Sequence, residues 1–575
     1  MNIKIIYIIF LIMFLFTSLH SQPVTTPVDF GGLDSLSKYN RNYDLLYDNQ
    51  SQDAMVYDNK KDETLGKIID DPRVKFSTYF GGNGYDCSYG LCVDSKDYIY
   101  FCGYTGSSDL PATDNAFQKS KSGGHDAFVA KFTQEGQPVW ITYYGGSGTD
   151  VALDMVCDSE DNVIICGKTN SNNLPNSSNT FNGDVDAFIL KMNEDGELLW
   201  SQYIGGRRFE SAEGIALLSN GFVVTGYTNS KNYPITEDAF QKELNLNWDN
   251  GVIYSEDPDA FITRYDLDGN IVYSTFFGAN DEVIAYSIAT DAEDNYAITG
   301  YMINCTDFPV SEDAFQRYPQ GAEDCFIAKF SSQNDYEWSS LVGGESTDIF
   351  KSVCFDKEHT LTLIGYTLSN NYPITENSYQ TEMNWLNDAI ITQFTNDGKI
   401  IWSTYFGGNS GEEAIKIFYN KNTLWITGYT QSTDLPVSED NLISKENDAP
   451  SVYILNLDLG GRLNWVSYYG VGFGYNVFAK DENVMITGET HAYKFPITQN
   501  AFQENNNDTG SEPYNGFVAN FDKLINNVKQ KKHREYSVYF NRKSKILTIN
   551  TQRINKHINI SIYNLLGNKI YDSNN

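Results

Sequence analysis

The sequence of 575 residues predicts an all-β protein. The expected fold is a seven-bladed β-propeller of four-stranded antiparallel blades, with its ring closed by the N-terminal strand and a partial β-sandwich tail behind it. Three observations predict this fold. An aromatic phrase of the type Trp-Ser-Thr-Tyr-Phe-Gly-Gly occurs seven times, at intervals of 60 to 73 residues. Each interval holds four strand-like segments, and the two ends of the array complement each other. A fixed period of this kind identifies a repeat architecture before any single residue does.

The aromatic phrase is expected to form the fourth strand of each blade. In one copy Trp402, Thr404 and Phe406 alternate with polar or aromatic neighbours, which places them on one face of a strand. The seven copies are Phe76–Gly82, Trp140–Gly146, Trp200–Gly206, Tyr273–Ala279, Trp338–Gly344, Ile401–Gly408 and Trp465–Val471.

The other three strands follow from shorter signatures. The first is exemplified by Ser287–Asp291, the second ends on Gly-Tyr-Thr as in Leu424–Tyr429, and the third begins with Asp-Ala-Phe or a variant such as Asp388–Phe394. An Asp-Gly pair often joins the third strand to the fourth, and this pair is typical of hairpin turns. In the longer connection between the second and third strands, Thr236 is expected to cap a helical turn and Phe240 to fold back onto its blade.

The ends of the array favour a closed ring. The array opens with a lone fourth strand, Phe76–Gly82, and finishes near Phe521 with only three strands. The first strand can therefore complete the last blade and remove the free edges. An open solenoid is the alternative, but solenoids carry capping repeats at both ends.

The repeated pieces resemble a known family. Trp-Ser-Thr-Tyr-Phe-Gly-Gly, Ile-Thr-Gly-Tyr-Thr, Phe-Pro-x-Thr-x-x-Ala-Phe-Gln and Asp-Ala-Phe-Val-Ala-Lys-Phe are similar to the SBBP seven-bladed beta-propeller repeats of Bacteroidetes type. The resemblance covers about Arg73 to Lys523 and implies the propeller. It implies little about function, because one fold hosts many functions.

Both termini suggest export. Met1–Ser21 reads as a cleaved signal peptide, with an uncleaved membrane anchor as the alternative. Residues 22–74 form a polar leader, which we expect to be extended. The propeller is assigned to residues 75–523, and no later segment is apolar enough to be a transmembrane anchor.

Residues 524–575 resemble the C-terminal sorting domain of the type IX secretion system. The similar pieces are Lys545–Asn550, Ile560–Gly567 and Lys569–Tyr571. The domain is truncated, and Phe540-Asn541-Arg542 stands where the family has Pro-Asn-Pro. The resemblance implies passage through the periplasm, the type IX secretion machinery as a partner, and a secreted or outer cell-surface location. The alternative is a generic β-rich tail.

The charge distribution excludes a nucleic-acid partner. The net charge is −34. From Lys523 onward there are 11 basic and 2 acidic residues, which leaves 30 basic and 73 acidic residues in the rest of the chain. Phosphate neutralisation needs lysine and arginine, so an acidic body with a basic tail indicates two units with different roles.

No catalytic constellation is visible, so the sequence favours a non-enzyme. The propeller segment holds three histidines in different repeats, at no ligand spacing: His125, His359 and His491. No metal site is expected, no cofactor is expected, and calcium is left open without support. Asp195, Gly196 and Trp200 are spaced as in the tryptophan-docking motif of quinoprotein dehydrogenases, but a hairpin followed by an aromatic strand explains the same spacing.

An exported chain permits disulfides. Three pairs are possible from position in the repeat: Cys92 with Cys102, Cys157 with Cys166, and Cys305 with Cys325. Cys102 and Cys166 occupy a slot filled by threonine in other repeats, which makes a buried free thiol an equal alternative.

One long connection predicts a binding surface. The segment Gln241–Pro258 has 18 residues where the same connection has eight in the first and fourth repeats. Trp248, Asp249 and Trp385 lie in such connections and are the candidate ligand-binding residues. The alternative is that the two indole rings cover their own loops.

Taken together, the sequence predicts an exported, non-catalytic binding or adhesion module with an extracellular glycan or protein ligand. An enzyme that degrades extracellular polysaccharide or protein is the first alternative. A structural surface or matrix protein is the second.

Overall fold

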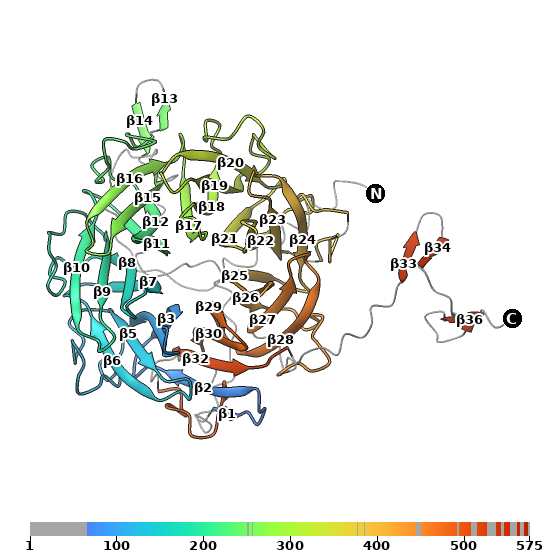
Figure 1. Ribbon diagram of the computed structural model, residues 1–575, viewed down its shortest axis with the longest axis horizontal. Coiled ribbons are helices and arrows are strands. Elements are labelled where there is room, and N and C mark those ends of the chain that lie inside the picture. Colours follow the sequence, from blue (N-terminus) through green and yellow to red (C-terminus); the bar gives the residue numbers. More distant parts are fainter. Residues whose placement is uncertain are drawn as a thin grey trace, which may run out of the picture. The chain divides into compact units, whose positions relative to one another are not determined.

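The computed structural model confirms the seven-bladed propeller of four-stranded antiparallel blades (Figure 1). Side chains are described for residues 66–245, 257–376, 378–384, 386–443, 450–491, 494–507 and 514–525, and backbone strands for parts of the remainder. The chain divides into two units, Met1–Lys60 and Lys61–Asn575, and all described residues lie in the second. None of them belongs to a helix, and no helix capable of crossing a membrane is found among them.

The first four blades run in chain order from the innermost strand to the outermost. Blade one is β3 (Asp86–Val93), β4 (Ile99–Thr105), β5 (Asp126–Phe132) and β6 (Pro138–Tyr144). Blade two is β7 (Asp150–Cys157), β8 (Val163–Thr169), β9 (Asp186–Met192) and β10 (Leu198–Ile204). Blade three is β11 (Glu210–Leu218), β12 (Gly221–Thr228), β15 (Asp259–Asp266) and β16 (Ile271–Phe277). Blade four is β17 (Val283–Thr290), β18 (Tyr296–Ile303), β19 (Glu323–Phe330) and β20 (Tyr336–Val342).

The last three blades complete the ring. Blade five is β21 (Asp348–Phe355), β22 (Leu361–Thr367), β23 (Asp388–Phe394) and β24 (Ile400–Phe406). Blade six is β25 (Glu412–Asn420), β26 (Thr423–Thr430), β27 (Ser451–Asp458) and β28 (Leu463–Val471). Blade seven is β29 (Phe473–Lys480), β30 (Asn483–Thr490), β32 (Asn515–Asp522) and β2 (Val74–Phe80).

The predicted ring closure is confirmed. Strand β2 pairs antiparallel with β32, so that Val74 lies opposite Phe521 and Phe80 opposite Gly516. The first strand of the array is therefore the outermost strand of the last blade, which completes that four-stranded sheet and closes the ring. Just before it, β1 (Lys67–Ile68) pairs in parallel with β31 (Pro496–Ile497), which adds a second contact between the start and the end of the array.

The hydrophobic core is divided into seven layers, one between each pair of consecutive blades. The layer between blades seven and one contains Phe80, Phe101 and Phe132, and the rings of Phe80 and Phe101 meet edge to face at 4.8 Å. Because both faces of each sheet are covered, second and third strands such as β4 and β5 are fully buried. This explains why the strands read as aromatic runs rather than as a strict polar alternation.

The fourth-strand tryptophans join consecutive blades. The indole nitrogen of Trp338 in blade four donates to the carbonyl oxygen of Asn396 in the turn of blade five, at 2.9 Å. Gly398 in that turn has φ +80°, and a Cβ there would lie 2.9 Å from the Trp338 ring. Related contacts are made by Trp140 with Gly196, Trp200 with Gly269 and Trp402 with Gly461. The spacing of Asp-Gly and Trp is thus fixed by contact between blades as well as by the hairpin.

Two local predictions are corrected. The residues around Thr236 form a turn and not a helical cap, because the Thr236 hydroxyl exchanges hydrogen bonds with the backbone of Ser274. Phe240 packs on Phe277 of its own blade, as expected, and also on Tyr336 of blade four. The first strand of blade four begins at Val283, four residues before the predicted start.

Three further strand pairs lie outside the blades. Within the connection of blade three, β13 (Asn247–Asp249) and β14 (Val252–Ser255) form an antiparallel hairpin. In the tail, β33 (Tyr536–Asn541) pairs with β34 (Ile546–Thr551), and β35 (Ser561–Tyr563) pairs with β36 (Lys569–Asp572).

Candidate functional site

The strand order gives the propeller two different faces. The links between blades and the long second-to-third connections leave from one face, here called the loop face. The short first-to-second and third-to-fourth turns leave from the other, here called the turn face. In blade three the long connection runs from residue 229 to residue 258 and carries the β13–β14 hairpin. A rigid scaffold that presents variable loops on one face is a common place for binding surfaces.

The sequence-predicted ligand residues lie in these connections. Trp248 and Asp249 are on β13, the first strand of the hairpin, but their side chains lie outside the described residues. Trp385 lies outside them altogether. The structure therefore places two of the three residues on a strand pair that the sequence did not predict, and it leaves their roles as a prediction.

The repeated motif residues form the junctions between blades. At the junction of blades five and six, the side-chain amide of Gln380 donates to Asp388 at 2.5 Å and accepts from the Gly407 backbone N–H at 2.9 Å. On the other side of the glycine pair, Glu412 accepts from the Gly408 N–H at 2.8 Å. Equivalent glutamines in other blades are Gln118, Gln241, Gln316 and Gln503. The motifs Phe-Gln, Gly-Gly and Asp-Ala-Phe are thus parts of one hydrogen-bonded joint.

These joints contain pairs of buried carboxyl groups. Four junctions place a third-strand aspartate of one blade beside a first-strand acid of the next: Asp126 with Asp150, Asp186 with Glu210, Asp324 with Asp348, and Asp388 with Glu412. Burial raises the pKa of Asp388 to about 6 and that of Glu412 to about 7, and the neighbouring carboxyl of Asp388 adds to the rise at Glu412. Raised pKa values often mark catalytic acids, but here the arrangement recurs around the ring and all eight side chains are buried.

Aromatic and charged side chains gather where the innermost strands meet the loop face. Glu489 replaces the tyrosine of the Gly-Tyr-Thr signature in blade seven and accepts hydrogen bonds from Tyr85 at 2.6 Å and Tyr475 at 3.0 Å. Burial raises the pKa of the Glu489 carboxyl. In blade five, the ammonium group of Lys351 lies 4.0 Å from the ring centre of Tyr286. Because these residues depart from the repeat, the repeat alone does not explain them.

An ion pair crosses the ring axis. Lys416 on β25 of blade six reaches Asp154 on β7 of blade two, with 3.0 Å between Nζ and Oδ2. Blades two and six are not neighbours, so the pair must span the space that the innermost strands enclose. The same strand position holds small or amide residues in the other blades: Gly90, Gly214, Ser287, Ser352 and Asn476. A ligand on the loop face would therefore meet this pair on the axis.

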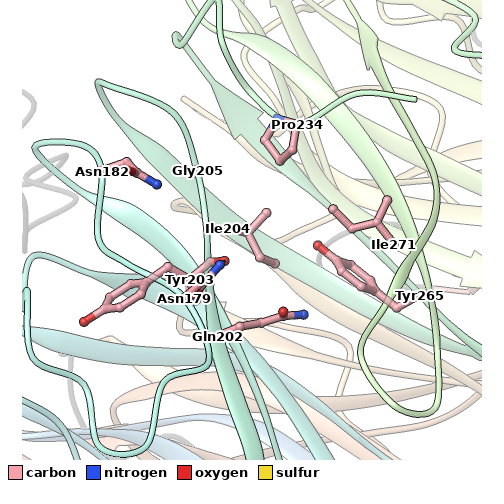
Figure 2. A pocket seen from close by; sticks show the side chains of 9 residues that line it. All are labelled: Asn179, Asn182, Gln202, Tyr203, Ile204, Gly205, Pro234, Tyr265 and Ile271. Atoms are coloured by element: carbon pink, nitrogen blue, oxygen red, sulfur yellow. Dashed lines mark hydrogen bonds between the residues drawn. The ribbon is translucent and has the colours of Figure 1, made fainter. Parts of the chain in front are cut away.

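A small pocket opens between blades two and three (Figure 2). It encloses about 200 Å³ and is lined by Asn179, Asn182, Gln202, Tyr203, Ile204, Gly205, Pro234, Tyr265 and Ile271. Strand β10 supplies one wall, and β15 and β16 supply the other. Tyr265 is 2% exposed, and its hydroxyl makes no well-formed hydrogen bond among the described residues, although the Thr263 side chain interacts with it. No lining residue is ionic at neutral pH.

The predicted disulfide pairs are wrong. The structure links Cys92 to Cys157, on the innermost strands of blades one and two, with 6.1 Å between their Cα atoms. Cys157 lies opposite Val163, so Cys166 points to the other face of the same sheet. Cys92 lies opposite Tyr100, and Cys102 lies opposite Gly90, two residue pairs further along the ladder. The alternative prediction of buried free thiols at Cys102 and Cys166 is confirmed.

The third predicted pair is also wrong, because its members face different layers of the core. Cys305 belongs to the cluster between blades three and four, and Cys325 belongs to the cluster between blades four and five. Both are buried free thiols. The sequence shows which repeat a cysteine belongs to, but alternation along a strand decides which neighbouring blade it faces.

One group of metal-type ligands comes together on the turn face. His359 Nδ1 lies 3.0 Å from Asp291 Oδ2 and 3.0 Å from Glu293 Oε2. The three residues come from the first turns of blades five and four, so spacing in the sequence could not predict the contact. In the equivalent turn of blade two, Asp161 reaches Ser95 of blade one. By analogy, the contact of His359 holds blades four and five together. The three side chains His359, Asp291 and Glu293 could also hold a metal ion.

Comparison with known proteins supports the repeat. The family model of the SBBP beta-propeller repeat matches residues 75–111 and 139–175. An uncharacterised WD repeat-containing protein of Acanthamoeba polyphaga mimivirus is 26% identical over 201 residues, which is 32% of this chain and 14% of that protein. A regulatory protein of Caulobacter vibrioides is 22% identical over 175 residues, 30% of this chain and 18% of that protein. The alignments thus span less than a fifth of either relative.

Solved structures resemble the chain only distantly. A polysaccharide lyase aligns with a TM-score of 0.39 and 10% identity, over 80% of this chain and 97% of that one. A gluconolactonase of Xanthomonas campestris aligns with a TM-score of 0.28 and 11% identity, over 63% of this chain and 93% of that one. At this level of similarity neither carries an argument about activity.

Proposed function

We propose that this chain is an exported, non-catalytic binding module that holds an extracellular glycan or protein on its loop face. The observation that carries the proposal is the β13–β14 hairpin, an extra strand pair in the long connection of blade three. Trp248 and Asp249 lie on this hairpin, and Trp385 lies in the corresponding connection of blade five. Tryptophan in such a position offers a broad apolar ring with one hydrogen-bond donor, which suits a sugar face or a protein anchor.

The loop face has further support from side chains that the ring does not require. Glu489 with its two tyrosines, and Lys351 above Tyr286, lie at the same end of the innermost strands. The ion pair of Lys416 and Asp154 crosses the axis. A ligand would therefore rest on the loop face and not thread through the ring.

The enzyme alternative has weaker support. A glycoside hydrolase needs two carboxyl groups beside one open substrate site. The paired carboxyls of this chain have raised pKa values, but Asp388 and Glu412 lie beneath the glycine pair and bond to the joint around it. The same arrangement in four junctions favours a structural role. The scaffold alternative predicts self-association without a soluble ligand.

The proposed route to the surface rests on the terminal segments. Residues 1–21 are proposed as the signal peptide, and residues 524–575 as a sorting domain that engages the type IX secretion machinery. Apart from Leu524 and Ile525, both segments lie outside the described side chains. Cell fractionation of a tagged full-length chain, with a version ending at Lys523 as the control, would test this route.

The function is tested by binding of the mature chain to an array of glycans and matrix proteins. Trp248→Ala and Trp385→Ala should each weaken a genuine hit at least tenfold. Leu199→Ala is a matched control, because Leu199 is 50% exposed on the outermost strand of blade two, away from the loops. A hit that survives both tryptophan variants would contradict the proposed site. Silence across the array together with self-association would favour the scaffold.

A further inference from the structure

The pocket between blades two and three sits where three repeat positions change together. At the last third-strand position, six blades carry apolar residues: Phe132, Met192, Phe330, Phe394, Leu457 and Phe521. Blade three alone carries a hydroxyl there, on Tyr265. The nearby hydroxyl of Thr263, on the same face of β15, bonds to Tyr233 and Ser274 at 2.9 Å each. The Tyr265 hydroxyl has only a weak interaction with Thr263. Burying a poorly bonded hydroxyl is costly, and no other blade places a hydroxyl at this position.

The second change is at Gln202 in the fourth strand of blade two. The six equivalent residues all carry a small hydroxyl: Thr78, Thr142, Thr275, Ser340, Thr404 and Ser467. In blade five, Thr404 accepts from the backbone of Gln380 and so fastens the connection to the strand. Gln202 instead extends across the junction and donates from Nε2 to the carbonyl oxygen of Gly269, at 2.6 Å. Its Oε1 accepts no hydrogen bond from a described residue.

The third change creates the space. Ile204 occupies a position that is aromatic in five of the other six blades and valine in the sixth: Phe80, Tyr144, Phe277, Phe406, Tyr469 and Val342. A branched aliphatic chain in place of a ring leaves room between β10 and β15. Figure 2 shows the Tyr265 ring across this room, with its hydroxyl end directed toward Ile204 and the Gln202 amide beneath it.

The connection above the pocket has also changed. Blade two, like blade six with Leu442 and Ile443, lacks the aromatic-Gln pair that the connections of the five other blades carry. Asn179 exchanges two hydrogen bonds of 2.8 Å with the backbone of Tyr203 in its place. Asn182 follows, with a backbone bond to Asp186 and an amide bond to Thr180 that leave its Oδ1 facing no described donor. The rim therefore offers amide groups, while Ile204, Pro234 and Ile271 supply apolar walls.

We infer that this pocket binds one neutral polyhydroxylated ring, a monosaccharide or the terminal residue of a glycan. The volume of about 200 Å³ lies below the range of ~300–1,000 Å³ usual for drug-sized ligands, which limits the occupant to a single small ring. The lining carries no ionic group, which favours a neutral ligand. Alternating hydroxyl and C–H groups on a sugar match the tyrosine hydroxyl and amides on one side and the aliphatic walls on the other.

The test uses the full mature chain and a panel of free monosaccharides and their methyl glycosides, measured by calorimetry and ligand-observed NMR. Tyr265→Phe removes one oxygen atom and restores the residue type that four other blades carry. Ile204→Phe fills the cavity with the residue type of other blades. Either change should weaken the binding of a sugar at least tenfold. Tyr144→Phe is the control, because Tyr144 is a buried tyrosine whose hydroxyl also makes no well-formed hydrogen bond but which does not line this pocket.

Three results would overturn the inference. The first is that no sugar in the panel binds at millimolar concentration. The second is equal binding by the wild type and both pocket variants. The third is equal loss in the Tyr144→Phe control, which would indicate a general effect of removing a buried hydroxyl. The pocket uses none of Trp248, Asp249 and Trp385, so its failure and that of the loop-face site are separate outcomes.

Discussion

The junction of blades five and six and the junction of blades two and three share one frame but use it differently. Both pair an aspartate with a glutamate beneath a glycine pair, and both dock a tryptophan on the next blade's turn. At the first junction, the side chain of Gln380 bonds to Asp388 and its backbone N–H bonds to Thr404, so these positions are filled by hydrogen bonds. At the second, the corresponding positions have changed and a pocket remains. Ring closure and ligand contact are therefore carried by different residues of one repeat, and departures from the repeat are the better guide to function.

The shared frame is tested most severely at the second-strand glycines. A Cβ on Gly428 or Gly226 would lie 1.9 Å from a backbone oxygen of the neighbouring strand. Backbone cannot yield as a side chain can, so Gly428→Ala and Gly226→Ala should each lower the free energy of unfolding by ~4 kcal/mol or more. Urea denaturation followed by tryptophan fluorescence measures this loss. Gly124→Ala, whose nearest contact is 3.5 Å, should cost less than ~1 kcal/mol. Unequal losses in blades three and six would contradict a common frame for the blades.

The paired carboxyls predict an unusual dependence of stability on pH. Burial raises the pKa of Glu210 and Glu412 to about 7, from the ordinary value of 4.5. Between these values the folded state holds protons that the unfolded state releases, so the free energy of unfolding falls as the pH rises from about 4.5 to 7. A difference of one pH unit between the folded and unfolded pKa values corresponds to ~1.4 kcal/mol. The protein should therefore be more stable at pH 5 than at pH 8.

Thermal melts of Glu210→Gln and Glu412→Gln across this pH range check the assignment. Each variant should flatten the slope by the contribution of one group, and by a similar amount, because the two junctions hold the same pair. A wild-type stability that rises from pH 5 to pH 8 would contradict the raised pKa values.

The two junctions should differ in how much stability they lose when a glutamine is replaced. Gln380→Ala leaves the Gly407 N–H without a partner and removes one of the two hydrogen bonds to Asp388 Oδ2, and an orphaned buried group costs ~1–3 kcal/mol. Gln202→Thr, in contrast, restores the hydroxyl of the other blades and should change the free energy of unfolding by less than ~1 kcal/mol. Denaturant midpoints compare the two. A large loss for Gln202→Thr would mean that this residue holds the ring together and is not free for a ligand.

The sequence predicted the repeat, the blade number and the closure, because each depends on signatures that recur in order along the chain. It could not predict contacts that depend on which face of a strand meets which neighbour. The Cys92–Cys157 link is one case, since the residues lie 65 apart and on different blades. The meeting of His359 with Asp291 is another. The sequence did contain a hint of the pocket, because Tyr265 is the only tyrosine among apolar residues at that repeat position. Only the structure shows that its hydroxyl is buried, which is what makes the position informative.

The smallest expected effect lies on the turn face, between blades four and five. His359→Ala removes the contacts to Asp291 and Glu293, yet the imidazole is 32% exposed and Glu293 is 59% exposed. Partly exposed ion pairs contribute ~0–1 kcal/mol, so the melting temperature should fall by only a degree or two. The same variant examines the metal question. If the three groups hold Zn²⁺, the ion should raise the melting temperature of the wild type and not that of His359→Ala. An equal response of both proteins would argue against a metal site. His359 would then serve to hold blades four and five together, as the equivalent turn of blade two does for blades one and two.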